Sequence, residues 1–132
     1  YMIAKPETIE MASAFGLGDY SLNLAGVAGA IACYNDSYFL DYSKSKIVEA
    51  KQMIMEALDQ EGLNSLPSQT NFMFIDLKDL NAEKFRAAMA DQGVLIRGIY
   101  RDYNNWSRVS MGTLEDVQKF VDTLPRAIEL VA

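Results

Sequence analysis

Two arginines are the residues of this sequence whose type and position could do the most specific chemistry. Arg97 ends one short apolar run and Arg108 begins another. A charge inside such a run needs an anion beside it, and the planar guanidinium group holds a carboxylate or a phosphate through two parallel hydrogen bonds. The pair therefore indicates an anion site. The alternatives are an internal ion pair with one of the 18 acidic residues, or a charge on an edge strand.

The composition excludes several other kinds of site. The chain has no histidine and a single cysteine, Cys33, which excludes the usual zinc sites, Ser/His or Cys/His nucleophile pairs and an internal disulfide. Cys33 lies in an alanine-rich stretch without a basic neighbour, which is typical of a packed thiol. We therefore predict no metal site and no catalytic residue in this chain.

Charge and hydropathy limit the partners. Twelve basic and 18 acidic residues give a net charge of −6, which lacks the basic surface that nucleic acid requires. The longest weakly polar run, residues 22–34, is too short to span a bilayer. We expect neither nucleic acid nor a membrane as a partner, and a length of 132 residues is sufficient for one domain with its own core.

The elements that must position the arginines can be predicted from apolar periodicity and from turn residues. In the first half, helices are expected at residues 6–15, 22–34 and 37–61. Asp19 or Ser21 would cap the second helix, and Gly62 would end the third. The third helix repeats apolar residues at helical spacing, which indicates a core face made of Ile47, Ala50, Ile54, Ala57 and Leu58.

The second half is expected to contain the sheet. A largely buried strand is predicted at Asn71–Leu77, and two further strands at Val94–Ile96 and Arg108–Met111. The last two strands would form a hairpin, which would bring Arg97 and Arg108 to the same end of the sheet. The whole is expected to be an α+β domain, with a small sheet covered by helices.

Two more helices are signalled by their caps. Asn81 would begin one helix, and Gly93 would close it. Thr113, followed by Glu115 and Asp116, would begin the last helix. Its apolar face is expected to consist of Val117, Phe120, Val121, Leu124, Ile128 and Val131.

Four segments occur in an order that resembles a known family. They are Tyr1–Glu7 ("YMIAKPE"), Pro67–Phe72 ("PSQTNF"), Gly93–Arg97 ("GVLIR") and Arg108–Thr113 ("RVSMGT"). Together they are similar to the C-terminal end of the fold-type I, pyridoxal-phosphate-dependent aminotransferases, and most of all to the histidinol-phosphate branch. The resemblance covers nearly the whole chain.

The resemblance implies a fold and a domain organisation. The expected fold is α+β, with a three- to four-stranded sheet covered by helices, as in the C-terminal small domain of these enzymes. Residues 1–60 would include the end of a large-domain strand and the connecting helices, and residues 61–132 would form the small domain proper. The apolar opening without an initiator methionine also indicates a fragment of a longer protein.

The resemblance also implies roles for particular residues. The arginine matching Arg108 binds the substrate's α-carboxylate, and in the histidinol-phosphate branch the one matching Arg97 joins it to hold the phosphate. Asn71 and Tyr20 are further candidates for substrate binding, with capping and turn roles as their alternatives. The loop between the arginines carries aromatic residues that either line a substrate pocket or form an exposed tip: Tyr100, Tyr103 and Trp106.

The cofactor would be pyridoxal 5'-phosphate in the full-length enzyme, with none expected on this fragment. The family's Schiff-base lysine and its other cofactor contacts match positions before Tyr1, and Lys5 is not that lysine. The fragment should therefore be inactive alone. The full-length protein is expected to be a cytoplasmic homodimer that transfers an amino group between a small amino substrate and 2-oxoglutarate or glutamate.

Three alternatives remain open from the sequence. Within the same fold, the enzyme could be another amino-acid aminotransferase or a decarboxylase of phosphate-bearing amino acids. From a different class, the chain could be a stand-alone regulatory domain that senses a small anion through Arg97 and Arg108.

Overall fold

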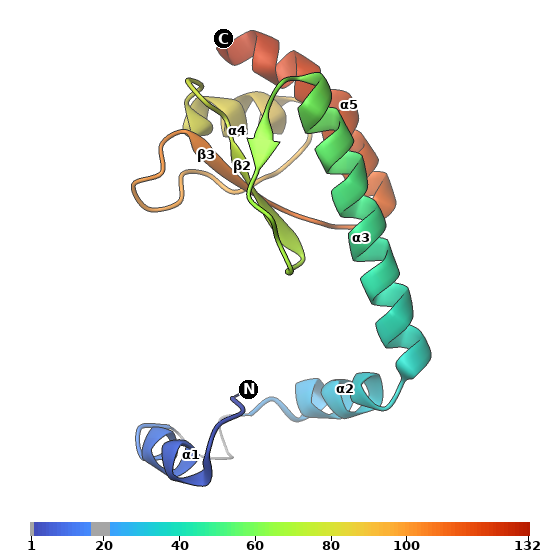
Figure 1. Ribbon diagram of the computed structural model, residues 1–132, viewed down its shortest axis with the longest axis vertical. Helices are drawn as coiled ribbons and strands as arrows, with labels where there is room; N and C mark the ends of the chain where they lie inside the picture. Colours follow the sequence, from blue (N-terminus) through green and yellow to red (C-terminus); the bar gives the residue numbers. More distant parts are fainter. Residues whose placement is uncertain (1, 17–21) are drawn as a thin grey trace. The chain divides into compact units, whose positions relative to one another are not determined.

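The computed structural model describes residues 2–16 and 22–132 (Figure 1). The elements in chain order are α1 (Pro6–Ser13), α2 (Leu24–Tyr34), α3 (Ser37–Gln60), β1 (Asn64–Ser65), β2 (Phe72–Asp76), α4 (Ala82–Asp91), β3 (Trp106–Ser110) and α5 (Leu114–Val131). The chain forms two compact units, Tyr1–Asp41 and Tyr42–Ala132, whose boundary falls within α3. None of the described helices is both long and apolar enough to cross a bilayer.

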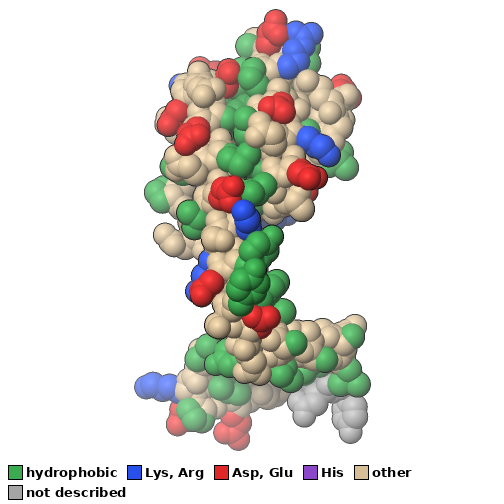
Figure 2. All heavy atoms as spheres, turned by 90° about the vertical axis from the view of Figure 1, so that its right-hand side faces the viewer, with side chains coloured by type: hydrophobic (Ala, Val, Ile, Leu, Met, Phe, Trp, Pro, Cys, Tyr) green, Lys and Arg blue, Asp and Glu red, His purple; other side chains and the backbone are tan. Residues whose placement is uncertain are grey.

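The N-terminal unit consists of helices that bury none of their own residues. Pro6 occupies the first turn of α1, where its missing N–H costs nothing. Asn23 caps α2, because its side chain accepts a hydrogen bond from the Gly26 amide at 2.9 Å. The two expected caps, Asp19 and Ser21, lie outside the described residues. Large apolar side chains of this unit are exposed, among them Ile3, Phe15, Leu24 and Tyr34. Figure 2 shows hydrophobic side chains on the surface of this unit.

The C-terminal unit is built on a three-stranded antiparallel sheet in the order β1-β2-β3. The central strand β2 pairs with β3 in a register that places Phe74 opposite Arg108. On its other edge, β2 pairs with the two-residue strand β1, in which Ser65 lies opposite Ile75. The predicted fold class, α+β with a small sheet covered by helices, is confirmed.

The predicted hairpin between residues 94–96 and 108–111 is wrong. Residues 94–99 have no regular secondary structure, and β3 pairs with β2 instead. Val94 and Ile96 pack against the core while Leu95 is 87% exposed. Burial therefore alternates along this short apolar run, but the described residues give it no strand partner, and the Val94 amide donates a hydrogen bond to the Met89 carbonyl at 3.0 Å instead.

One face of the sheet forms the core with α3, α4 and α5. Alternate strand residues point into it, since Met73, Ile75 and Val109 are nearly fully buried. The predicted face of α3 is largely confirmed, with Ala50, Ile54, Ala57 and Leu58 buried. Three residues of the predicted face of α5 are buried, namely Val117, Phe120 and Leu124, and Ala127 is buried as well. The buried residues of α4 are Ala82, Phe85, Ala88 and Met89.

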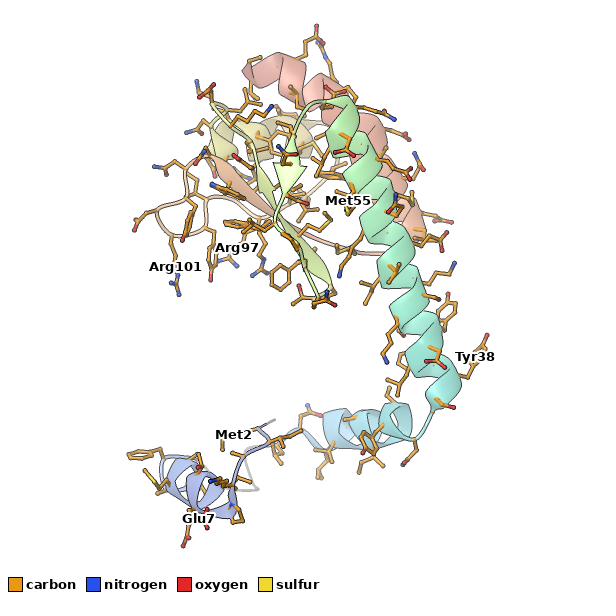
Figure 3. All side chains as sticks on the ribbon, viewed as in Figure 1. Met2, Glu7, Tyr38, Met55, Arg97 and Arg101 are labelled. Carbon is orange, nitrogen blue, oxygen red and sulfur yellow. The ribbon has the colours of Figure 1, made fainter. Side chains whose placement is uncertain are left out.

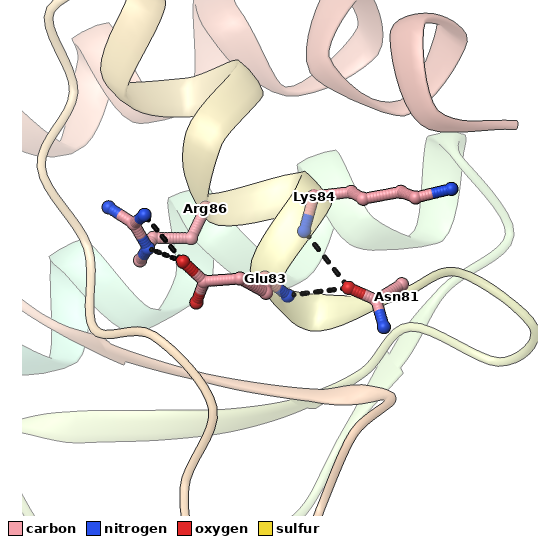
Figure 4. A network of polar contacts seen from close by, with 4 residues as sticks. All are labelled: Asn81, Glu83, Lys84 and Arg86. Atoms are coloured by element: carbon pink, nitrogen blue, oxygen red, sulfur yellow. Dashed lines mark hydrogen bonds and ion pairs between the residues drawn. The ribbon is translucent and has the colours of Figure 1, made fainter.

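The ends of these helices match their expected signals. Asn81 accepts hydrogen bonds from the Glu83 and Lys84 amides, both at 3.0 Å, and Glu83 pairs with Arg86 one turn later (Figure 4). This contact with the guanidinium group lowers the pKa of the Glu83 carboxyl below its ordinary value. Gly93 ends α4 with a φ of +82°, a conformation that favours glycine.

The N-terminus of α5 is closed by a capping box. Thr113 accepts a hydrogen bond from the Asp116 amide at 3.2 Å, and the Asp116 carboxylate accepts one from the Thr113 amide at 3.1 Å. The Thr113 hydroxyl also donates to this carboxylate at 2.8 Å. These contacts lower the pKa of the Asp116 carboxyl, with the hydroxyl contact contributing most.

Candidate anion-binding site

The candidate site lies on the face of the sheet opposite the core. Because side chains alternate along a strand, Met73 and Ile75 enter the core while Phe72 and Phe74 lie on the other face. In β3 the same alternation buries the neighbours of Arg108 and leaves Arg108 half-buried. Antiparallel pairing then brings Arg108 beside Phe74.

The guanidinium group of Arg108 lies close to an aromatic ring, and Arg108 has no acidic partner in the described structure. Its guanidinium carbon lies 4.8 Å from the centre of the Phe72 ring. Its Nε is buried without a hydrogen-bond partner. The ion pairs among the described residues are Lys46–Glu49, Glu83–Arg86 and Arg126–Glu129. The internal ion pair considered from the sequence is therefore not formed there.

Arg108 lines an open pocket of about 350 Å³. The other lining residues are Leu66, Pro67, Ser68, Gln69, Thr70, Phe72, Phe74 and Tyr100. The pocket combines one permanent cation with aromatic walls, and such a site suits a small ligand that has an anionic end.

The segment before β2 forms one wall of this pocket and is held by its own hydroxyl groups. Ser68 donates a hydrogen bond to the Phe72 carbonyl at 2.6 Å, and Thr70 donates to the same carbonyl at 3.2 Å. Lys51 of α3 donates to the Ser68 carbonyl at 2.8 Å. These contacts fix the wall relative to β2 and α3, so the pocket does not depend on an unsupported loop.

Tyr100 connects the pocket to two more arginines. The guanidinium carbon of Arg97 lies 5.0 Å from the centre of the Tyr100 ring, and that of Arg101 lies 5.5 Å from it. Both arginines belong to the segment between α4 and β3 (Figure 3). Arg97 is exposed and does not line the pocket itself. Arg97 and Arg108 are therefore brought to one face through an aromatic ring, and not through the predicted hairpin.

The aromatic residues of the loop form a cluster on Phe74. Tyr100 and Tyr103 contact it edge-on at centroid distances of 6.1 and 5.5 Å, and Trp106 stacks on it at 5.0 Å. Of these three, only Tyr100 lines the Arg108 pocket. Tyr103 and Trp106 support the ring that forms its floor.

The remaining predicted residues lie elsewhere or are not described. Asn71 is exposed and does not line the pocket, and its carbonyl accepts a hydrogen bond from the Met111 amide at 2.9 Å. Tyr20 lies outside the described residues. Lys5 is the N-cap residue of α1. Phe72 and Phe74 also line the pocket and were not predicted to do so, although their alternation with Met73 and Ile75 places them on the face of Arg108.

The residues of the pocket do not provide a covalent anchor for pyridoxal phosphate. The lining residues include no lysine, so no Schiff base could form there. Among residues 2–16 and 22–132, no cluster of three or more Cys, Asp or Glu residues could hold a metal ion. The pocket can therefore bind and orient an anion, and its chemistry as described is limited to that.

Comparison with known proteins decides the family. A model of the family "aminotransferase class I and II" matches residues 7–124, which is most of the chain. The chain belongs to this family. The aminotransferase match includes α2, α3, the sheet and most of α5, so it contains the whole Arg108 pocket.

Several histidinol-phosphate aminotransferases are similar to this aminotransferase chain. That of Brachyspira hyodysenteriae is 32% identical over 87% of the chain and 33% of its own length, and that of Oceanobacillus iheyensis is 29% identical over 83% and 31%. A protein of Erwinia carotovora atroseptica SCRI1043, provisionally named a histidinol-phosphate aminotransferase, has a solved structure with a TM-score of 0.84 and 35% identity over 94% of the chain and 35% of its own.

A second solved structure contains the cofactor. The histidinol-phosphate aminotransferase of Sinorhizobium meliloti, solved in complex with pyridoxal-5'-phosphate, matches with a TM-score of 0.76 and 29% identity over 94% of the chain and 34% of its own. The chain thus spans about a third of the length of the proteins that it matches.

Proposed function

We propose that this chain is the substrate-anchoring C-terminal part of a pyridoxal-phosphate-dependent aminotransferase that acts on histidinol phosphate. The observation that carries the proposal is Arg108, which lines a pocket on the open face of the sheet with no acidic partner among the described residues. The similarity of the chain to histidinol-phosphate aminotransferases supports the choice of substrate.

In this proposal the arginines hold the acidic end of each substrate in turn. The terminal Nη groups of Arg108 bind the phosphate of histidinol phosphate in one half-reaction and a carboxylate of glutamate in the other. Arg97 adds a second positive charge, which matters more for the phosphate because it carries two negative charges near neutral pH. Asn71 and Tyr20 remain proposed substrate contacts.

Pyridoxal phosphate, when bound, supplies the electron sink for proton removal at the substrate's Cα. The pocket described above supplies orientation. Holding the anionic end fixes the distance between the reacting carbon and the cofactor, and such positioning lowers the activation barrier without covalent chemistry by the arginines themselves.

The first helices are proposed to pack against a larger domain of the full-length enzyme. Neither α1 nor α2 buries a residue, and α2 exposes large apolar side chains such as Leu24 and Ile31. Exposed apolar surface of this kind usually marks an interface. In this proposal residues 1–60 contain the end of a large-domain strand and the connecting helices, and residues 61–132 form the small domain proper, against which the buried residues of α3 pack. A cytoplasmic homodimer is part of the same proposal, which sedimentation and cell fractionation would test.

The experiment that tests the substrate uses the full-length enzyme and the Arg97→Ala variant. We expect kcat/KM to fall clearly more for histidinol phosphate than for glutamate, because the dianion needs the second cation. Arg126→Ala is the matched control, since Arg126 lies exposed on α5 and contacts Glu129. Equal values for Arg97→Ala and wild type in both half-reactions would contradict the histidinol-phosphate assignment and favour a general amino-acid aminotransferase. Release of CO2 from a phosphate-bearing amino acid, tested separately because histidinol phosphate has no carboxylate, would indicate the decarboxylase.

A further inference from the structure

Tyr100 has a position that the binding of one anion by Arg108 does not explain. Its ring lines the Arg108 pocket, contacts Phe74 edge-on, and lies within 5.0 and 5.5 Å of the guanidinium carbons of Arg97 and Arg101. An aromatic face attracts a cation through its quadrupole, and arginine is the residue that most often uses this contact. One ring therefore holds two cations beside a pocket that contains a third.

The three arginines form an uncompensated positive cluster. None of them makes an ion pair in the described part of the chain, although the protein as a whole has a net charge of −6. Arg97 and Arg101, whose guanidinium carbons lie 5.0 and 5.5 Å from the centre of the same ring, repel each other, and this repulsion is offset when an anion binds beside them. The energy released is larger for an anion with two charges than for one with a single charge.

Arg101 has a backbone conformation that residues other than glycine rarely adopt. Its φ is +54°, in the left-handed region, where residues other than glycine are uncommon. The Tyr103 amide donates a hydrogen bond to the Tyr100 carbonyl at 3.1 Å, and these two residues form an isolated β-bridge that closes the turn around Arg101. The turn thus holds Arg101 against the Tyr100 ring at some conformational cost.

We propose that Tyr100 is a positioning residue that holds Arg97 and Arg101 beside the Arg108 pocket, and that this set selects phosphomonoester dianions over carboxylates. The inference rests on the proposed function, because it takes the Arg108 pocket as the place where the anion binds. It adds two residues to that function: Arg101 as a third cation and Tyr100 as its support.

The test measures the binding of two small anions to the full-length enzyme by titration calorimetry, so it does not depend on turnover. Inorganic phosphate at pH 8 is the dianion probe, since its second ionisation lies well below that pH, and acetate is the monoanion probe. The variants are Tyr100→Leu, which removes the aromatic face, Tyr100→Phe, which keeps it, and Arg101→Asn, since asparagine tolerates a positive φ.

Lys78 offers a matched control for Arg101. It is the other described residue with a positive φ besides glycine, at +56°, and it is a cation that does not line the pocket. Lys78→Asn therefore makes the same change in net charge at the same kind of backbone position. Any effect of Arg101→Asn that Lys78→Asn also shows would come from overall charge or from the backbone.

We expect the Kd for phosphate to rise about fivefold in Tyr100→Leu and in Arg101→Asn, with less than about a twofold change for acetate. Tyr100→Phe and Lys78→Asn should bind both anions as the wild type does. An unchanged phosphate Kd in Arg101→Asn, whose aromatic cluster is intact, would overturn the inference even if Tyr100→Leu proves misfolded. Equal weakening of acetate and phosphate would overturn it as well.

One further variant separates this inference from the proposed function. If Arg108→Met weakens both anions while Arg101→Asn weakens neither, the Arg108 site stands and only the role of Tyr100 and Arg101 fails. If Arg108→Met leaves both Kd values unchanged, the anion does not bind in this pocket, and both proposals fail.

Discussion

Replacing Arg108 by methionine in the full-length enzyme is the most direct perturbation of the site. The guanidinium carbon of Arg108 lies 4.8 Å from the centre of the Phe72 ring. Methionine keeps an unbranched stem that can cover the ring, and it removes the charge. The variant therefore isolates the hydrogen bonds to the ligand from the packing of the side chain.

The expected size of the effect follows from the contacts that are lost. A hydrogen bond to a charged group contributes about 1.5–3 kcal/mol, which corresponds to a loss of about 10- to 150-fold in kcat/KM. Stability should change little, because Arg108 makes no ion pair with the described residues and its Nε is a buried donor without a partner. Removing an unsatisfied donor together with its charge is nearly neutral or stabilising.

The assay compares both half-reactions and the melting temperature of four proteins: wild type, Arg108→Met, Arg108→Lys and the exposed control Arg126→Ala. Arg108→Lys should recover only part of the activity, since an ammonium group lacks the planar fork. Arg126→Ala should match the wild type. Near-wild-type kcat/KM in Arg108→Met for every substrate would refute the reasoning. A large fall in melting temperature in the same variant would show that Arg108 is a structural residue instead.

Two further predictions concern the elements that carry the site. Thr113→Ala should weaken the start of α5 by about 1 kcal/mol, seen as faster hydrogen exchange in its first turn. The same change should raise the pKa of the Asp116 carboxyl toward its ordinary value in an NMR titration, so the stabilisation that the wild type loses as the pH falls below about 4 should shrink; an unchanged titration would contradict the capping box. Gly93→Ala should cost about 1 kcal/mol of local stability at the end of α4, because φ there is +82°. Exchange rates like those of wild type would count against that conformation.

The helices of the C-terminal unit could be predicted because single capping residues and glycines mark where they begin and end. Asn81 and Thr113 act as caps, and Gly62 and Gly93 adopt the positive φ that ends a helix. Such signals are local, so neighbouring residues suffice to read them. Asn23 was not one of the two expected caps of α2, because Asp19 and Ser21 precede it by a few residues and are equally suitable by type; the hydrogen bond from the Gly26 amide to its side chain identifies it.

Strand pairing could not be predicted in the same way. The pairing of β2 with β3 joins residues 30 to 38 positions apart, from Asp76 with Trp106 to Phe72 with Ser110. The predicted hairpin failed because residues 94–96 alternate in burial without a strand partner among the described residues. The two-residue strand β1 has no period at all, so no pattern could indicate it. Apolar alternation reports which side chains are buried, and the choice of neighbour depends on the whole fold.

For the same reason the site was only partly predictable. The type of Arg108 and its place in a strand indicated an anion contact, and the structure adds the surroundings that make such a contact useful. An acidic neighbour would have neutralised the arginine, but it would also have competed with every ligand. The Phe72 ring attracts the guanidinium group of Arg108, and the Tyr100 ring attracts those of Arg97 and Arg101. Such contacts do not occupy the hydrogen-bond donors of the arginines. These three arginines form no ion pair among the described residues of a chain with 18 acidic residues, and this supports the proposed anion site.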